Sequence, residues 1–293
     1  MTRLLILGGG GILGSEVIRE AESRGFDYSA PRSQDLDITD RQTLNDYVLN
    51  FKPTWIVNCA AWTNVDGAEK NPELAYTLNA AAVHNLASAA LAAGSAVIHI
   101  STDYVFDGNS TTPYEVTDQI NPINQYGVSK QQGEEILLKS SLPNAYVLRT
   151  SWLYGTNGKN FVKTISKKAV TRELANVVDD QSGSPTSARD LARGIFSLIH
   201  VKPDPGIFHF ANKGKCTWYR FAQEIYKLSD SDPSLVQPIS SASLQLAAKR
   251  PMNSELSTFK WEEFKLGGIK SWEEALAEAF PEIIARVTEE MQN

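Results

Sequence analysis

The sequence has few cysteines and no excess of basic residues. Only Cys59 and Cys216 are present in 293 residues, and they lie too far apart in sequence to form a disulfide framework. The net charge is -6, whereas proteins that bind nucleic acid usually carry a basic face. These two absences favour a reducing, cytoplasmic setting and argue against a nucleic-acid partner.

Long hydrophobic runs and metal motifs are also missing. The apolar segment at residues 4–13 is interrupted by four consecutive glycines, and no other run approaches the length that spans a membrane. We therefore expect neither a signal peptide nor a membrane partner. No metal site is expected either, because no ligand spacing links the four histidines, His84, His99, His200 and His209.

The first half of the chain instead alternates between two patterns. Short apolar runs typical of strands alternate with amphipathic or alanine-rich stretches typical of helices. Such alternation predicts a doubly wound, Rossmann-like parallel sheet, because parallel crossovers need helices on both faces. We assign residues 1–150 to this dinucleotide-binding domain. The strands are expected at residues 3–7, 28–30, 55–57, 96–100 and 145–150, and the helices at 12–21, 40–51, 72–93 and 126–138.

The pattern loosens after residue 151. We interpret residues 151–293 as a smaller mixed α/β lobe that binds substrate and is interleaved with the end of the sheet. A further strand is expected at residues 206–210, and helices are expected at residues 161–170, 188–199, 218–228 and 272–280. The overall fold class is thus α/β, with a large sheet domain and a smaller C-terminal lobe.

A glycine cluster separates the first strand from the first helix. Gly9, Gly11 and Gly14 match the G-x-G-x-x-G spacing, and Gly8, Gly11 and Gly14 match the three-residue spacing of short-chain dehydrogenases. Glycine permits a tight turn and close approach of the backbone to phosphate, and the helix N-terminus attracts negative charge. Either spacing predicts a dinucleotide pyrophosphate at this turn.

The end of the second strand carries a cation where NAD-binding proteins usually carry an acid. Arg32 stands there, and a guanidinium suits a 2′-phosphate that a carboxylate would repel. This favours NADPH as the cofactor, with NADH as the alternative if Arg32 is only a solvated loop residue. Asp37 and Ile38 are expected to flank the adenine, and the segment 58–63 to run beneath the cofactor.

Three residues form a candidate catalytic set. Thr102 ends a predicted strand at the edge where such sheets bind ligands. Tyr126 and Lys130 are four residues apart, on one face of a predicted helix. A tyrosine phenol has a pKa of about 10, which a neighbouring ammonium would lower. We expect Tyr126 to act as the acid, Lys130 to tune it and hold the nicotinamide ribose, and Thr102 to hold a substrate carbonyl.

Longer strings resemble a known family. The run of residues 101–108, Ser-Thr-Asp-Tyr-Val-Phe-Asp-Gly, resembles the signature of dTDP-4-dehydrorhamnose reductases, members of the extended short-chain dehydrogenases. The resemblance extends over almost the whole chain. Further matching positions are residues 126–130, 149–152 and 180–181, with Gly183, Pro185, Thr186, Arg250, Pro251, Asn253, Ser254 and Leu256.

The resemblance implies roles for individual residues. Gly11, Ile12 and Leu13 would contact the cofactor pyrophosphate, and Ala61, Trp62 and Thr63 would line its groove. The residues implied at the substrate are Thr102 and Asp103 at the sugar, Trp152 packed against it and Arg250 at the diphosphate. Many members carry a small residue or histidine in place of Trp62, so its indole would narrow the sugar pocket.

The implied reaction is hydride transfer from NADPH to C4 of a dTDP-4-keto-6-deoxy-L-hexose, which gives dTDP-L-rhamnose. The substrate is thus a nucleotide sugar, and the protein would be a monomer or a homodimer. Two alternatives use the same scaffold. A sugar dehydratase would need a glutamate where Tyr104 stands, and an epimerase usually has an acidic ribose partner. A non-catalytic NADP-binding regulatory subunit would be expected to lack the Tyr–Lys pair.

Overall fold

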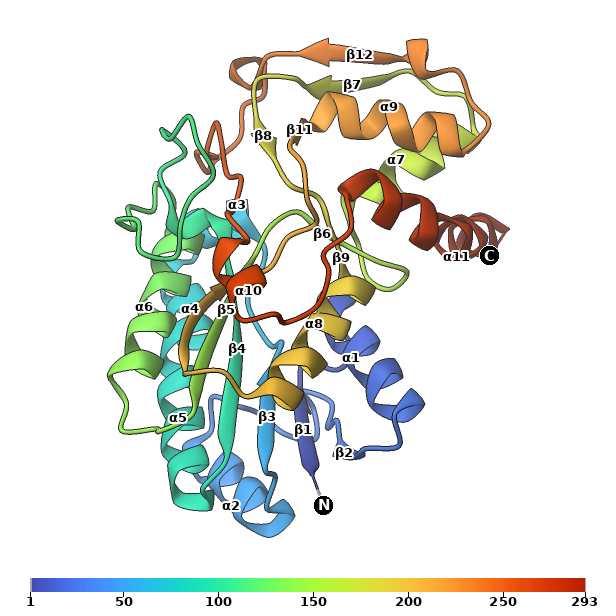
Figure 1. The fold of residues 1–293 in the computed structure, drawn as a ribbon. Helices are drawn as coiled ribbons and strands as arrows, with labels where there is room; N and C mark the ends of the chain where they lie inside the picture. The colour runs from blue at the N-terminus through green and yellow to red at the C-terminus, as the bar shows by residue number, and fades with distance from the viewer. Residues whose placement is uncertain (1, 293) are drawn as a thin grey trace.

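A six-stranded parallel sheet forms the larger part of the protein (Figure 1). The computed structural model describes residues 2–292. The strand order is β2–β1–β3–β4–β5–β10, so the chain leaves β1 first toward one edge and then toward the other. Ligands bind where the strand order reverses in this way. The strands are β1 (Arg3–Leu7), β2 (Asp27–Ser29), β3 (Trp55–Asn58), β4 (Ala96–Thr102), β5 (Ala145–Thr150) and β10 (Gly206–His209).

Helices cover both faces of this sheet because successive strand residues point to opposite sides. Leu4 and Ile6 pack in the core beneath α1 (Ile12–Ser23) and α8 (Ala188–Val201). Leu5 and Leu7 pack in a second core on the other face. That second core is covered by α2 (Arg41–Phe51), α5 (Ala82–Ala93) and α6 (Gln125–Lys139). The predicted doubly wound α/β fold is confirmed.

The predicted alanine-rich helix at residues 72–93 contains a local irregularity. It consists of α4 (Pro72–Tyr76), a π-helical turn at Thr77–Ala81, and α5, which ends at Gly94. Single π turns of this kind are frequent at functional sites. Within the turn, the buried Asn79 accepts a hydrogen bond from the Trp62 backbone N–H and donates to the Trp62 carbonyl. The irregular turn therefore fixes the segment that follows β3.

The smaller lobe has its own hydrophobic core. Its helices are α7 (Phe161–Val170), α9 (Trp218–Leu228) and α11 (Trp272–Gln292). Three short strand pairs complete it, namely β7 (Ala175–Val178) with β12 (Val236–Ile239), β8 (Ser182–Gly183) with β11 (Cys216–Thr217), and β6 (Leu153–Tyr154) with β9 (Thr186–Ser187). Figure 1 shows this lobe beyond the end of the sheet, while β10 and α8 return to the sheet domain.

Helix α11 is longer than predicted. The pattern suggested an end before Pro281, but the helix continues to Gln292. Proline inside a helix normally costs about 3 kcal/mol. Beyond it, Ile283 and Val287 are fully buried in the lobe core, and that packing offsets the lost backbone hydrogen bond.

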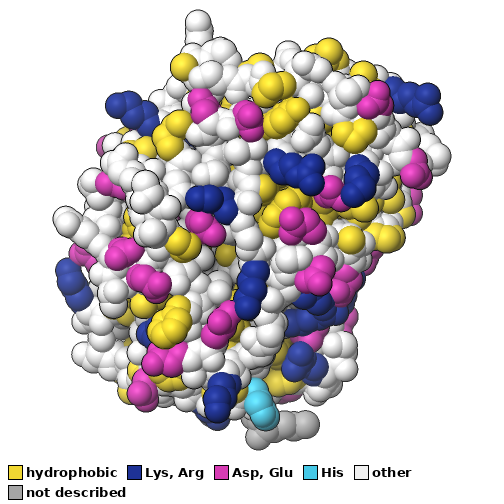
Figure 2. All heavy atoms as spheres, turned by 45° about the horizontal axis from the view of Figure 1, so that its top comes forward, with side chains coloured by type: hydrophobic (Ala, Val, Ile, Leu, Met, Phe, Trp, Pro, Cys, Tyr) yellow, Lys and Arg dark blue, Asp and Glu magenta, His cyan; other side chains and the backbone are white. Residues whose placement is uncertain are grey.

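Two further short helices pack on the sheet domain, α3 (Val65–Lys70) against α6 and α10 (Phe259–Glu263) against the edge strand β10. None of the helices in residues 2–292 has the length and hydrophobicity needed to cross a membrane. Figure 2 shows basic and acidic side chains interspersed over the face that includes the smaller lobe.

Candidate active site

A cavity of about 490 Å³ opens at the carboxyl ends of the central strands. It brings together segments that follow β1, β3, β4 and β5 and the start of α6, together with a loop of the smaller lobe. Most of the predicted site residues line it: Gly11, Ile12, Leu13, Gly14, Ala61, Thr63, Thr102, Asp103, Tyr126, Lys130 and Trp152. The predicted edge of the sheet is therefore the place where these side chains meet.

The glycine turn forms one end of the cavity. Gly11 is the N-cap of α1 and makes no side-chain cap, so no side chain occupies the amides of the first turn. Gly8 has a φ of +77°, and its carbonyl accepts the Gly11 N–H at 3.0 Å. A Cβ on Gly14 would lie 2.2 Å from the Gly8 oxygen. A tight, bare helix N-terminus of this kind fits a pyrophosphate.

The residues predicted at the adenine lie apart from the cavity lining, and their contact with the cofactor stays a prediction. Arg32 is exposed, whereas Asp37 accepts hydrogen bonds from the Thr39 backbone N–H (2.8 Å) and hydroxyl (2.7 Å). Ile38 packs in the core on the α2 side of the sheet. The side chains of Asp37 and Ile38 thus serve a local turn and the core, and they do not line the cavity.

Thr102 and Asp103 form a buried polar pair at the end of β4. The Thr102 hydroxyl donates to Asp103 Oδ1 at 3.0 Å and accepts the Tyr104 backbone N–H at 3.2 Å. Burial raises the pKa of Asp103 to about 7, although its hydrogen bonds oppose the shift. A neutral carboxylic acid and a carboxylate are therefore both accessible at this position near neutral pH.

Tyr126 stands at the start of α6, which Asn124 caps by accepting the Gly127 N–H at 2.8 Å. The Tyr126 ring meets Tyr104 edge-on, with ring centroids 5.8 Å apart. Burial raises the pKa of Tyr126 to about 12, which corrects the expectation that Lys130 lowers it. The phenol is consequently protonated at neutral pH.

Lys130 is turned toward the strands rather than toward solvent. Its Nζ donates to the Ile100 carbonyl at 2.6 Å and lies 3.2 Å from His99 Nε2. Only 1% of the residue is exposed, and burial lowers the pKa of Lys130 to about 8. This orientation explains why the ammonium does not dominate the pKa of Tyr126.

Three buried polar atoms at the cavity have no partner within residues 2–292. They are Ser101 Oγ, Asp103 Oδ2 and Thr150 Oγ1. Buried polar groups are rarely left without hydrogen bonds, so these atoms mark the polar character of the residues around the cavity. The sequence reasoning missed Thr150 as a wall residue, although it ends a predicted strand beside Thr102.

Trp152 forms the wall that faces the smaller lobe. Its φ of +46° is uncommon for a bulky residue and marks a constrained position. The indole stacks on that of Trp218, with ring centroids 3.5 Å apart and planes 7° apart. Gly158 and Lys159, which no sequence signal indicated, line the cavity from the same lobe.

Trp62 and Arg250 also lie outside the cavity lining, as do Gly8 and Arg32. Trp62 donates its indole N–H to the Asn64 carbonyl at 3.1 Å. Arg250 makes an ion pair with Asp66 at 2.6 Å and also donates to the Ala248 carbonyl. The charge of Arg250 is thus matched by Asp66 in this structure, and its contact with a diphosphate stays a prediction.

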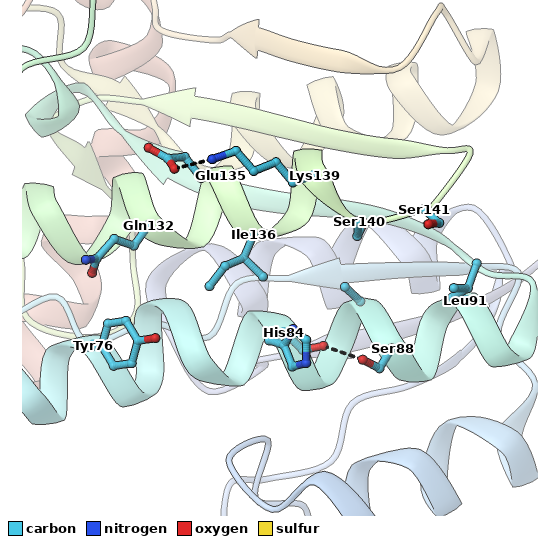
Figure 3. A pocket seen from close by; sticks show the side chains of 11 residues that line it. Tyr76, His84, Ser88, Leu91, Gln132, Glu135, Ile136, Lys139, Ser140 and Ser141 are labelled. Atoms are coloured by element: carbon cyan, nitrogen blue, oxygen red, sulfur yellow. Dashed lines mark hydrogen bonds and ion pairs between the residues drawn. The ribbon is translucent and has the colours of Figure 1, made fainter.

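A second hollow lies on the outer surface between α5 and α6 (Figure 3). Its side chains partly satisfy one another, as in the Lys139–Glu135 ion pair at 2.8 Å. It contains none of the predicted site residues. Within the part of the chain that the structure describes, no group of three His, Cys, Asp or Glu side chains is arranged to hold a metal ion.

The fold and the site together define a Rossmann-type protein with a Tyr–Lys pair at the dinucleotide crevice. The family model described as RmlD substrate binding domain matches residues 1–284. The chain belongs to this family, and the predicted membership of the dTDP-4-dehydrorhamnose reductase family is confirmed.

Individual relatives match almost the full chain. A dTDP-4-dehydrorhamnose reductase of Streptomyces griseus is 37% identical over 289 residues, covering 97% of this chain and 95% of its own. A dTDP-4-keto-6-deoxy-D-glucose reductase of Streptomyces niveus is 37% identical, covering 95% and 96%. The crystal structure of the Bacillus anthracis dTDP-4-dehydrorhamnose reductase in complex with NADP has a TM-score of 0.92 and 37% identity, covering 96% and 100%.

Proposed function

We propose that this protein is an NADPH-dependent reductase of the C4 keto group of a dTDP-linked 6-deoxy sugar. The substrate supported best is dTDP-4-dehydro-L-rhamnose, and the product is dTDP-L-rhamnose. The observation that carries the proposal is one cavity that combines the bare N-terminus of α1 with Thr102, Tyr126 and Lys130. The similar full-length relatives named as 4-keto sugar reductases support the same reaction.

Each residue has a separate role in the proposed reduction. NADPH, when bound along the glycine turn, supplies the hydride that reduces the carbonyl carbon. Tyr126 is the acid, since the raised pKa keeps its phenol protonated until the substrate oxygen takes the proton. The Thr102 hydroxyl orients that oxygen. Lys130, one helical turn after Tyr126, tunes the proton transfer from the phenol. Asp103 and Thr150 line the same cavity and are the candidate partners of the sugar hydroxyls.

Two observations favour reduction over the alternatives. A dehydratase needs a base after Asp103, but the residue there is Tyr104, and burial raises the pKa of its phenol above the ordinary value. A phenol so reluctant to ionise is a poor base. A regulatory subunit without catalysis would have no reason to keep Tyr126 and Lys130 buried at one cavity.

The cofactor preference rests on Arg32. An exposed guanidinium after β2 is free to reach a 2′-phosphate, and NADP is bound in the B. anthracis structure. NADH remains the alternative cofactor. A monomeric or homodimeric state in the cytoplasm is also part of the proposal, and sedimentation analysis of the purified protein tests the assembly.

A substrate panel tests the proposal directly. The oxidation of NADPH and of NADH is followed by absorbance with several nucleotide-linked 4-keto sugars that differ in base and in sugar stereochemistry. We expect turnover with the dTDP-linked 4-keto-6-deoxy-L-sugar and a preference for NADPH. Absence of turnover with every 4-keto sugar, in a preparation that binds NADPH, would reject the reductase.

A further inference from the structure

Beneath the cavity lies a buried row of three polar side chains from three different elements. Asn58 on β3 and His99 on β4 are register partners, and Asn58 Nδ2 lies 3.0 Å from His99 Nδ1. The other imidazole nitrogen, His99 Nε2, lies 3.2 Å from Lys130 Nζ on α6. Each of the three residues is at most 1% exposed. Water therefore does not compete for these contacts.

The orientation of Asn58 is fixed by the backbone. Its Oδ1 accepts the Ala60 N–H at 3.1 Å, and a backbone N–H can only donate. If the Asn58 amide were flipped, its NH₂ group would face the Ala60 backbone N–H, and two donors would oppose each other. The amide nitrogen of Asn58 must therefore face His99 and donate to Nδ1, which leaves Nδ1 without a proton.

His99 consequently carries its single proton on Nε2. The imidazole is neutral, because burial, with the nearby Lys130, lowers the pKa of His99 well below its usual value. The Nε2–H bond then points at Lys130 Nζ. An ammonium has three donors and no acceptor, whereas a neutral amine has a lone pair that accepts this N–H. The bond from Lys130 to the Ile100 carbonyl forms with either state.

We propose that Asn58 and His99 are positioning residues that favour the neutral amine form of Lys130 by presenting it with a donor. This proposal rests on the proposed reductase function. Reduction consumes one proton at the substrate oxygen, which Tyr126 supplies. A Lys130 ammonium opposed by a donor gives up its proton readily to restore the phenol, and the resulting amine then accepts the His99 N–H. Water that enters the cavity, which Lys130 lines, returns the proton to Lys130 after the product leaves.

The other groups that face Lys130 do not cancel this effect. Burial raises the pKa of the Cys59 thiol to about 12, so the thiol beside the lysine is uncharged. The Glu134 carboxylate on α6 favours the ammonium. However, Arg149 holds Glu134 in a buried two-bond pair, with distances of 2.9 and 2.7 Å. The phenol of Tyr126 is uncharged at neutral pH.

The tautomer of His99 is measurable without any assay of activity. Long-range ¹H–¹⁵N correlation spectra of the full-length protein distinguish a protonated from an unprotonated imidazole nitrogen. Only four histidines are present, and the His99→Gln variant assigns the signal. We expect protonated Nε2 and unprotonated Nδ1 in the wild type. A proton on Nδ1 instead would overturn the proposal.

Asn58→Asp, a substitution of similar size and shape, is designed to reverse the tautomer of His99. A carboxylate keeps an acceptor for the Ala60 N–H and presents a second acceptor to His99, so the imidazole proton should move to Nδ1. Nε2 then accepts from the Lys130 ammonium. The ¹³Cε signal of Lys130, assigned with Lys130→Arg, should titrate at least about one pH unit higher than in the wild type.

Asn144→Asp is the control, because it adds the same charge at an exposed position before β5. It should leave both the tautomer and the lysine titration unchanged. If Asn58→Asp also leaves both unchanged, the proposed coupling is wrong. Failure of the wild type to reduce any 4-keto sugar would reject the proposed function, and the tautomer measurement would still stand on its own.

Discussion

Asp103 gives the protein a stability that depends on pH in a predictable direction. Burial raises the pKa of its carboxyl from 3.8 to about 7, so the folded protein binds a proton that the unfolded chain has already lost. A carboxyl with a raised folded-state pKa stabilises the fold fully at low pH. This contribution is lost as pH rises from about 4 through about 7. A shift of roughly three units corresponds to about 4 kcal/mol, as an upper figure.

Asp103→Asn replaces the carboxyl with a neutral amide of the same shape. The free energy of unfolding is measured in urea at pH 5 and at pH 8. Its decrease from pH 5 to pH 8 should be smaller in the variant than in the wild type. We expect the difference between the two proteins to change by about 2 to 3 kcal/mol over this range, because only about two of the roughly three pH units between the two pKa values lie within it. Comparing the two proteins cancels other buried acids such as Glu16, whose pKa is also raised by burial. Parallel stability curves for both proteins would refute the reasoning.

Three further predictions concern the binding of cofactor and sugar. Gly14→Ala should weaken NADPH binding at least tenfold by calorimetry, because the new Cβ would lie 2.2 Å from a backbone oxygen; unchanged affinity would exclude the tight turn. Arg32→Asp should shift the ratio of kcat/KM values toward NADH, and an unchanged ratio would show that Arg32 does not contact the 2′-phosphate. Trp218→Ala should raise the KM for the sugar several-fold and lower stability by about 2 kcal/mol, because Trp152 loses its stacked partner. Trp218→Phe should restore most of both, and equal effects of the two substitutions would contradict the stacking role.

Local patterns were sufficient to predict the main elements of the sheet domain. The strands at residues 3–7 and 145–150 agree with β1 and β5, because buried parallel strands are continuous apolar runs. The edge strand β2 is displaced by one residue, since a short edge strand has only a weak pattern. The π turn at Thr77–Ala81 has no sequence signal, because its helical pattern continues on both sides.

The meeting of Thr102, Tyr126 and Lys130 at one cavity was predictable because each residue occupies a characteristic place in the fold. Thr102 ends a strand, and Tyr126 and Lys130 begin a helix, so strand ends and helix spacing bring them together. The network behind them was not predictable. His99 was one of four unassigned histidines, and its contacts with Asn58 and Lys130 join residues 41 and 31 positions apart in the sequence.

Two predictions that rest on charge meet surroundings that the sequence did not reveal. Arg250 was expected at a substrate diphosphate, and that role stays a prediction; in the structure Asp66, 184 residues earlier, pairs with it. Lys130 was expected to lower the pKa of Tyr126, but burial instead raises the pKa of this phenol. Neither the partner of a charge nor the depth of its burial can be read from a linear sequence.

The role of Tyr126 as the acid is tested most directly by Tyr126→Phe in a single-turnover experiment with NADPH and dTDP-4-dehydro-L-rhamnose. Removal of the phenol oxygen should leave NADPH affinity unchanged and slow the reduction by about 1,000-fold. Reduction at the wild-type rate by this variant would contradict the account.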